Sequence, residues 1–443
     1  MRTARYLCLL SVVAVMIPAC DAQEGGTDRS ADAKAFVSLL TANDFSKATG
    51  MFDETMRKAL PETKLRDTWE ALSQQAGAFQ RQEGTRTTRV QAYDVVFVTC
   101  AFERARLDVK VVFDGRGRVA GLFFVPAPAG PIDAPAAYIT PGAYHEREVT
   151  IGSGTWAVPG TLTLPNGAGP FPAVLLVHGS GPQDRDETIG ANKPFRDIAW
   201  GLASKGVAVL RYEKRTKAHG ADLNPLPLPF TVKEETIDDA VAAVDLLRTT
   251  PEIDEGRVYV LGHSLGGMLM PRILAASKGT AGGIILAGTT RPLEDVITEQ
   301  TNYLSLLDGQ KSAEEQRQID AVQALANRVK QLNENDAQNA ELLFGAPASY
   351  WLDLRKYDPV EAVRATQQPL LVLQGERDYQ VTMKDFDRWK AALSARTDVH
   401  LKSYPGLNHL FFEGKGPANP GEYDVPGHVA EQVITDIAAW INR

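Results

Sequence analysis

The sequence predicts an α/β domain preceded by a small α+β domain. Between residues 31 and 125, apolar residues first recur at helical spacing and then alternate with a period of two, which is typical of an α+β unit. Over residues 144–443, buried β-branched runs are separated by helical stretches, which favours an α/β architecture. A chain of 443 residues is long enough for both domains.

The first 22 residues have the pattern of an export signal. Two arginines form a positively charged start, residues 7–17 are apolar, and residues 18–22 contain the small residues of a cleavage zone. The apolar run is too short to span a bilayer as a helix. Cleavage in a segment that resembles a bacterial lipoprotein box would leave a lipidated Cys20, whereas cleavage after Ala22 would release a periplasmic or secreted protein. We expect export, and the lipoprotein box favours the first outcome.

The small domain is predicted to consist of helices followed by a meander of strands. Helical spacing covers residues 35–49 and 62–75. The predicted strands are residues 86–93, 94–102, 106–113 and 118–125. Cys100 is expected to be a small buried strand residue, since processing would leave it without a disulfide partner.

The same domain resembles the small cone-shaped domains of nuclear-transport-factor or ketosteroid-isomerase type. Its sequence has no grouping of carboxylates and histidines that indicates a catalytic site. Packing or dimerisation into a homo-oligomer is therefore its expected role. Residues 126–143 are rich in proline and alanine and are predicted to form a semi-rigid linker. A hairpin, residues 147–151 and 158–164, is expected to begin the α/β domain over residues 144–443.

The most informative motif is a G-x-S-x-G pattern at residues 262–266, whose centre is Ser264. It lies between a β-branched run, residues 257–261, and an apolar helical stretch, residues 268–276. A strand-to-helix turn this tight strains the serine backbone and requires glycines on both sides, because a Cβ there would collide with neighbouring backbone. The hydroxyl of Ser264 is then exposed at a helix N-terminus, which makes Ser264 the candidate nucleophile.

A serine hydroxyl is a poor nucleophile unless a base takes its proton and a carboxylate orients that base. Asp378 follows an apolar, β-rich run that ends in glycine, and His409 lies in a loop after another predicted strand. Both residues come just past the end of a strand, where open α/β sheets place working residues. Ser264, Asp378 and His409 occur in the required chain order. Glu376 remains an alternative for the acid.

A fourth feature supplies hydrogen-bond donors. The predicted strand at residues 171–177 runs into a glycine-rich turn at residues 178–181. Backbone N–H groups in such a turn can stabilise a developing oxyanion. We assign the oxyanion hole to the N–H groups of Ser180 and Leu265.

With these features in order, residues 146–443 resemble an α/β-hydrolase. Residues 178–195 and 209–215 are similar to bacterial serine esterases related to dienelactone hydrolases and serine aminopeptidases. Glu213 stands where one common form of that family has aspartate. The resemblance implies cleavage of a small-molecule acyl ester through an acyl-enzyme, with no metal and no organic cofactor. Propensity and charge pattern predict helices at residues 294–307, 313–332 and 336–344, within an insert at about residues 292–366. The resemblance implies that this insert forms a lid.

Charge and composition exclude some classes of protein. The formal net charge of −8 argues against nucleic-acid binding, because phosphate contacts require a basic surface. Contact with a membrane is expected only through a lipid on Cys20, and no metal cluster emerges from the seven histidines. Two alternatives remain open, a serine peptidase or amidase of the same fold and a non-catalytic cell-envelope binding protein.

Overall fold

The computed structural model describes residues 29–90, 93–127, 135–220, 223, 229–307, 309–339 and 341–443. The chain divides into two compact units near residue 130. The predicted export signal, residues 1–22 with Cys20, lies outside the described residues.

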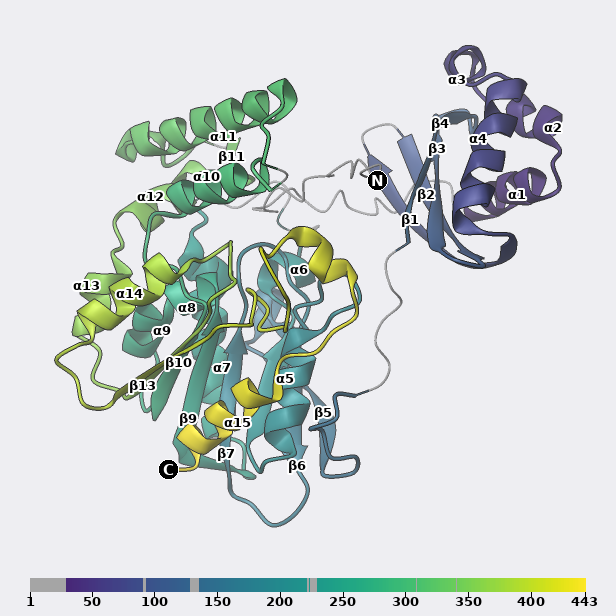
Figure 1. Cartoon of the computed structure of the whole chain (residues 1–443). Coiled ribbons are helices and arrows are strands. Elements are labelled where there is room, and N and C mark those ends of the chain that lie inside the picture. Colours follow the sequence, from purple (N-terminus) through teal and green to yellow (C-terminus); the bar gives the residue numbers. More distant parts are fainter. Residues whose placement is uncertain are drawn as a thin grey trace. The chain divides into compact units, whose positions relative to one another are not determined.

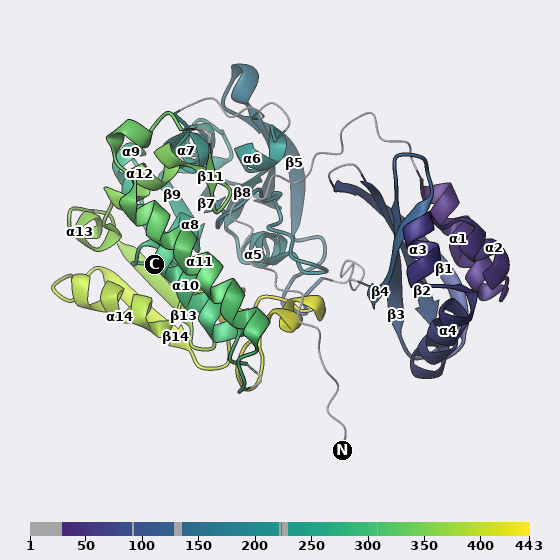
Figure 2. The same cartoon turned by 90° about the horizontal axis from the view of Figure 1, so that it is seen from above.

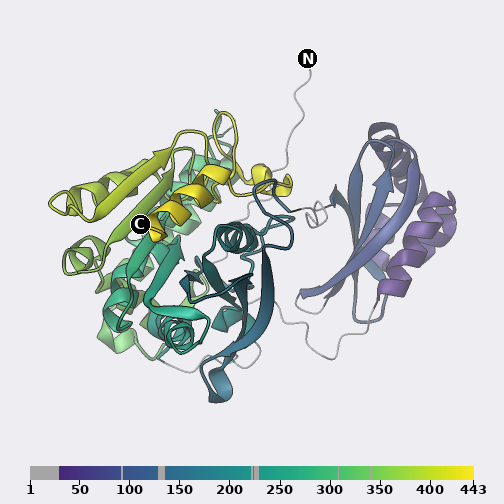
Figure 3. The same cartoon turned by 90° about the horizontal axis from the view of Figure 1, so that it is seen from below.

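The small unit is a four-stranded antiparallel sheet with helices on one face (Figures 1 and 3). Its elements are α1 (Ser30–Thr41), α2 (Phe45–Gly50), α3 (Glu54–Ala59), α4 (Glu62–Ala76), β1 (Phe79–Val90), β2 (Tyr93–Phe102), β3 (Arg106–Phe113) and β4 (Val119–Pro126). The strands follow one another in chain order. Their inner faces and the helices enclose one apolar core, which includes Phe36, Trp69 and Cys100. Cys100 is fully buried, as expected, and burial raises the pKa of its thiol to about 12.

The predicted helix over residues 35–49 is interrupted in the structure. Asn43 has a φ of 57°, a left-handed conformation that asparagine tolerates better than most residues. The side chain of Asp44 then accepts a hydrogen bond from the N–H of Lys47 at 3.2 Å and starts α2 as its N-cap. The first strand begins at Phe79, seven residues before the predicted start.

The predicted linker, residues 126–143, is shorter in the structure. Its C-terminal part packs on the larger unit, where Ile139 is 4% exposed and the N–H of Thr140 donates to Ser204 Oγ at 3.0 Å. The larger unit therefore begins before residue 144. The composition of this segment is otherwise that of a linker, so single apolar residues such as Ile139 did not indicate that it packs on the larger unit.

The larger unit contains an eight-stranded sheet with the order β14-β13-β10-β9-β7-β8-β6-β5. Its strands are β5 (Tyr144–Ile151), β6 (Val158–Pro165), β7 (Phe171–Val177), β8 (Ala208–Tyr212), β9 (Ile253–His263), β10 (Gly282–Leu286), β13 (Leu370–Gly375) and β14 (Val399–Tyr404). The pairs β5–β6 and β6–β8 are antiparallel, and all the other pairs are parallel. The carboxyl ends of β7, β9, β13 and β14 therefore share one edge of the sheet.

Helices cover both faces of this sheet. They are α5 (Pro194–Ala203), α6 (Arg215–Ala218), α7 (Asp238–Arg248), α8 (Leu265–Met268), α9 (Met270–Ala276), α14 (Met383–Ala392) and α15 (Glu431–Ile441). Side chains alternate across β7, so that Val174 and Leu176 pack with α5 and α15, whereas Leu175 and Val177 pack with α7, α8 and α9. Figure 3 shows the yellow helix α15 against one face. The predicted fold class, α/β after a small α+β domain, is confirmed.

The predicted insert, residues 292–366, contains α10 (Leu293–Leu304), α11 (Ala313–Gln331), β11 (Leu342–Leu343), β12 (Ala346–Pro347), α12 (Ala348–Arg355) and α13 (Pro359–Arg364). Figures 1 and 2 show α10 and α11 side by side above the end of the sheet from which α8 starts. The helix predicted at residues 336–344 was wrong: residues 337–338 form a turn, Leu342–Leu343 form β11, and positive φ angles at Phe344 and Gly345 close the β11–β12 hairpin. Among the described helices, none combines the length and the apolar character that crossing a membrane requires.

Candidate active site

Ser264 lies at the turn between β9 and α8, in a conformation that few non-glycine residues adopt. Its φ is 53° and its ψ is −112°. Two backbone hydrogen bonds hold it there: the N–H donates to Leu286 O, and the carbonyl accepts from the N–H of Met268, each at 2.9 Å. Such strain persists only where the surrounding structure imposes it, and it is typical of functional sites.

The glycines around Ser264 are required by close backbone contacts. A Cβ on Gly262 would collide with the carbonyl of Gly266. A Cβ on Gly266 would lie 2.5 Å from the carbonyl oxygen of Val177, on the neighbouring strand β7. The spacing of glycines in the motif therefore follows from the packing of this turn.

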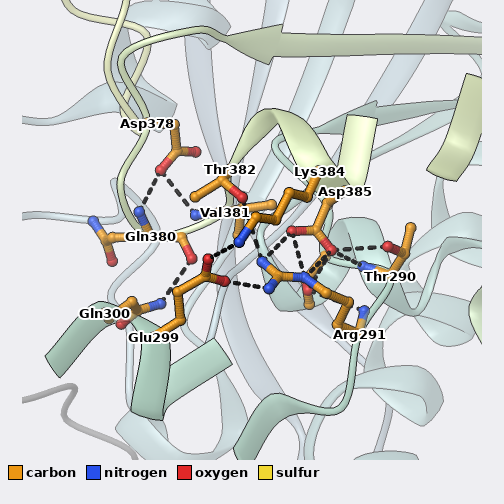
Figure 4. A network of polar contacts seen from close by, with 12 residues as sticks. Thr290, Arg291, Glu299, Gln300, Asp378, Gln380, Val381, Thr382, Lys384 and Asp385 are labelled. Atoms are coloured by element: carbon orange, nitrogen blue, oxygen red, sulfur yellow. Dashed lines mark hydrogen bonds and ion pairs between the residues drawn. The ribbon is translucent and has the colours of Figure 1, made fainter. Parts of the chain in front are cut away.

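Asp378 follows β13 and is buried, and both of its carboxylate oxygens accept hydrogen bonds; Figure 4 shows those from Gln380 and Val381. Oδ1 accepts hydrogen bonds from the backbone N–H groups of Gln380 and Val381, at 2.7 and 2.9 Å. Oδ2 accepts from His409 Nδ1 at 2.6 Å and from Gln374 Nε2 at 3.1 Å. Because the carboxylate can only accept, Nδ1 of His409 carries a proton, which leaves Nε2 as the basic nitrogen.

The structure brings Asp378, and not Glu376, to His409. Glu376 is exposed, and its Oε1 accepts a hydrogen bond from Ser403 Oγ on β14 at 2.7 Å. Successive residues after the strand point in different directions, so two carboxylates separated by one residue have different surroundings.

The loop that carries His409 is fixed by Asn408. The Oδ1 atom of Asn408 accepts from the N–H groups of Leu410 and Phe412, each at 3.1 Å, and its Nδ2 donates to Glu422 Oε2 at 2.9 Å. His409 is 5% exposed. Its carbonyl accepts from Nε2 of His263, the residue before Ser264, at 3.0 Å. This bond ties the histidine loop to the serine turn.

The glycine-rich turn after β7 lies beside the serine. A Cβ on Gly179 would be 3.2 Å from the Cβ of Ser264. The N–H of Gly179 is already donated to Glu187 Oε1 at 2.8 Å. The next N–H group, that of Ser180, and the N–H of Leu265 at the start of α8 are the ones that we assigned to the oxyanion hole.

Residues 174–422 match the family model described as "Alpha/beta hydrolase family", which is more than half of the chain. The chain belongs to the alpha/beta hydrolase family. Residues 33–122 of this hydrolase match the family described as "Protein of unknown function (DUF3887)".

Curated relatives extend this comparison. Esterase EstD of Thermotoga maritima is 40% identical to the hydrolase over 410 residues, which cover 93% of this chain and 94% of the relative. Acyl-coenzyme A thioesterase 2, mitochondrial, of Mus musculus is 28% identical over 191 residues, 42% of this chain and 37% of the relative. Among solved structures, Est1E from Butyrivibrio proteoclasticus is 16% identical and covers 67% of this chain and 99% of its own, with a TM-score of 0.42.

The insert at residues 292–366 is attached to the loop of Asp378 through α10 (Figure 4). Gln300 on α10 donates to the carbonyl of Gln380 at 2.9 Å, and Glu299 on the same helix pairs with Arg291. Arg291 in turn binds Asp385, a fully buried carboxylate at the start of α14, at 2.7 Å. These contacts place α10 against the segment whose N–H groups hold Asp378.

A buried ion pair that sequence reasoning did not identify lies next to Ser264. Nδ1 of His263 is 2.9 Å from Glu187 Oε2, and both side chains are almost fully buried. Burial opposes the charged imidazole of His263, but the Glu187 carboxylate outweighs it and raises the pKa of His263. Burial likewise opposes the charged form of Glu187, but His263 outweighs it and lowers the pKa of Glu187.

This pair predicts a pH dependence of stability that Glu187→Gln removes. Because the pKa of His263 is raised on folding, its contribution is complete below about pH 6.5 and is lost as the pH rises through the raised pKa. Because the pKa of Glu187 is lowered, its contribution is present above about pH 4.3 and is lost as the pH falls through the lowered pKa. We expect the unfolding midpoint of the wild type to exceed that of Glu187→Gln most between about pH 5 and 6.5. The difference should shrink as the pH rises through the raised pKa of His263.

Thermal unfolding of both proteins across this pH range measures the difference. A difference that stays constant from mildly acidic to alkaline pH would contradict the ion pair, because a neutral His263 contributes no such titration.

Within the described residues, no group of three or more histidine, cysteine, aspartate or glutamate side chains could hold a metal ion.

Proposed function

We propose that this hydrolase is an exported serine esterase that cleaves small carboxylic esters through an acyl-enzyme. The observation that carries the proposal is the 2.6 Å hydrogen bond between Asp378 and His409, in a loop that is bonded through His263 to the turn of the strained Ser264. The 40% identity to a protein named Esterase EstD supports ester substrates.

The geometry supports the following reaction. Ser264 Oγ attacks the ester carbonyl carbon while His409 Nε2 takes its proton, and Asp378 stabilises the resulting imidazolium through Nδ1–H. The N–H groups of Ser180 and Leu265 stabilise the tetrahedral oxyanion. His409 then donates the proton to the departing alcohol. A water molecule, deprotonated by His409, attacks the acyl-enzyme, and collapse of the second tetrahedral intermediate releases the acid and restores Ser264.

A substrate ladder with a covalent probe tests the proposal. p-Nitrophenyl esters from acetate to long acyl chains are compared with aminoacyl p-nitroanilides, and a fluorophosphonate label is located by peptide mass. The expected result is ester turnover with the label on Ser264. Preferred cleavage of the anilides would instead indicate a peptidase or amidase. No turnover and no label would support a binding protein.

We also propose that the chain is exported and that a lipid on Cys20 attaches it to a membrane. The support is the charge, apolar run and cleavage zone of residues 1–22. Intact mass of the protein from a bacterial host that processes lipoproteins distinguishes the outcomes. A diacylglyceryl mass on Cys20 supports the proposal, whereas a start after Ala22 shows release without a lipid, and an intact N-terminus contradicts export.

A further inference from the structure

The carbonyl group of Gly179 accepts a hydrogen bond from a buried ammonium group. Lys214, which follows β8, is 1% exposed, and its Nζ lies 2.9 Å from Gly179 O. On the other side of the same residue, the N–H of Gly179 donates to the buried Glu187. Two buried charged side chains thus hold both polar groups of a glycine that lies against Ser264.

Lys214 is itself part of a buried network. Its Nζ lies 3.2 Å from Oε1 of Glu235, which is also 1% exposed and belongs to a π-helical turn, Lys233–Ile237, before α7. The other oxygen of Glu235 accepts from the hydroxyl of Tyr350, on α12 of the insert, at 2.8 Å. Removing two charges from water is costly, and apolar residues of similar volume are often at least as stabilising. The burial of this ion pair is therefore weak evidence for a purely stabilising role of Lys214.

Peptide geometry links Lys214 to the oxyanion hole. The bond between Gly179 and Ser180 is trans, so the carbonyl of Gly179 and the N–H of Ser180 lie in one plane and point in opposite directions. An ammonium group that fixes the carbonyl therefore also fixes the direction of the N–H. A cation on the carbonyl side polarises the peptide and makes the N–H a stronger donor, an effect that is larger in a buried, low-dielectric site.

We propose that Lys214 is a positioning residue that orients and polarises the Gly179–Ser180 peptide, so that the N–H of Ser180 stabilises the oxyanion. Lys214 does not touch the substrate and acts through this peptide. The inference rests on the proposed function, because it needs an oxyanion to form beside Ser264.

Two variants and one matched control test this role. Lys214→Met removes the ammonium group, and the double variant Lys214→Met/Glu235→Gln also avoids leaving a buried carboxylate without its partner. The control is Arg215→Met/Asp239→Asn, which removes the adjacent, largely buried pair, joined at 3.1 Å. Among the described contacts this pair has no hydrogen bond to Gly179, so its loss reports the general cost of removing a largely buried ion pair here.

Three quantities are measured for each protein: kcat and KM for the p-nitrophenyl ester that the wild type cleaves best, the inhibition constant of a matching trifluoromethyl ketone, and the thermal unfolding midpoint. The ketone forms a tetrahedral adduct whose oxyanion occupies the hole. Loss of one direct donor costs about 10²- to 10³-fold in kcat, so we expect about 10- to 100-fold for the indirect effect of Lys214. KM should change by less than about threefold, and ketone binding should weaken by about the same factor as kcat.

The outcomes separate this inference from the proposed function. If the wild type shows neither ester turnover nor ketone binding that depends on Ser264, the proposed function and the role of Lys214 are both overturned. The role of Lys214 alone is overturned if the wild type has Ser264-dependent activity and the folded double variant retains the same kcat and ketone affinity. An equal loss in the Arg215→Met/Asp239→Asn control would also overturn it, because the effect would then follow any lost ion pair. A loss confined to the Lys214 variants supports it.

Discussion

Ser264→Ala is expected to reduce kcat for p-nitrophenyl esters by about 10⁵- to 10⁶-fold and to abolish fluorophosphonate labelling. The alanine keeps the Cβ and both backbone hydrogen bonds of this turn, which join residue 264 to Leu286 and Met268. It removes the atom that forms the bond to the acyl carbon. The unfolding midpoint should therefore stay close to that of the wild type while turnover disappears.

The matched control for this variant is Ser394→Ala, at an exposed serine whose hydroxyl bonds to the carbonyl of Ala391. It should retain wild-type kcat, KM and labelling. Substantial ester hydrolysis by purified Ser264→Ala would refute the assignment of the nucleophile, whatever the behaviour of the control.

Asp378→Asn is expected to reduce kcat by about 10⁴-fold, because it places the proton of His409 on the wrong nitrogen. The N–H groups of Gln380 and Val381 both donate to Oδ1 of residue 378. They would hold the amide oxygen of the asparagine in that position and turn its NH₂ group towards His409. Facing a donor, Nδ1 of His409 would become the acceptor, and Nε2 would carry the proton and lose its basicity.

A comparison of kcat with that of Glu376→Gln checks this explanation. Glu376 is the other carboxylate in the same loop, but it bonds to Ser403 and not to His409. Glu376→Gln should keep kcat within about threefold of the wild type, since exposed substitutions of this kind have small effects. A large loss in Glu376→Gln with little loss in Asp378→Asn would reverse the assignment of the acid.

The position of the nucleophile could be read from the sequence because its constraints fall within one short motif. Gly262 is required by a contact within the turn, with the carbonyl of Gly266, and Gly266 is required by the close approach of Val177 on the neighbouring strand β7. Asp378 and His409 were found from their order and from their position after predicted strands. Position after a strand is informative because the carboxyl ends of parallel strands share one edge of the sheet, where residues that follow different strands come together.

Residue types predicted secondary structure less well in segments where the same residues can adopt several backbone conformations. The helix predicted across residues 35–49 breaks at Asn43, and the described residues of the helix predicted at 336–344 include a turn and the first strand of a short hairpin. Helical propensity differs by less than about 1 kcal/mol between ordinary residues, so a single left-handed residue or a tertiary contact overrides it.

The sequence by itself therefore determined the two domains, the α/β class, the strained serine and its order with Asp378 and His409. Tertiary structure alone decided which polar groups support them. Three supporting residues belong to types that usually face solvent. Gln374 contacts Asp378, 4 residues away, Glu187 contacts His263, 76 residues away, and Lys214 contacts Gly179, 35 residues away. Periodicity reports which face of an element is apolar, but it does not report which charged side chain turns inward. That choice is made when distant segments pack and a buried polar group must find a partner.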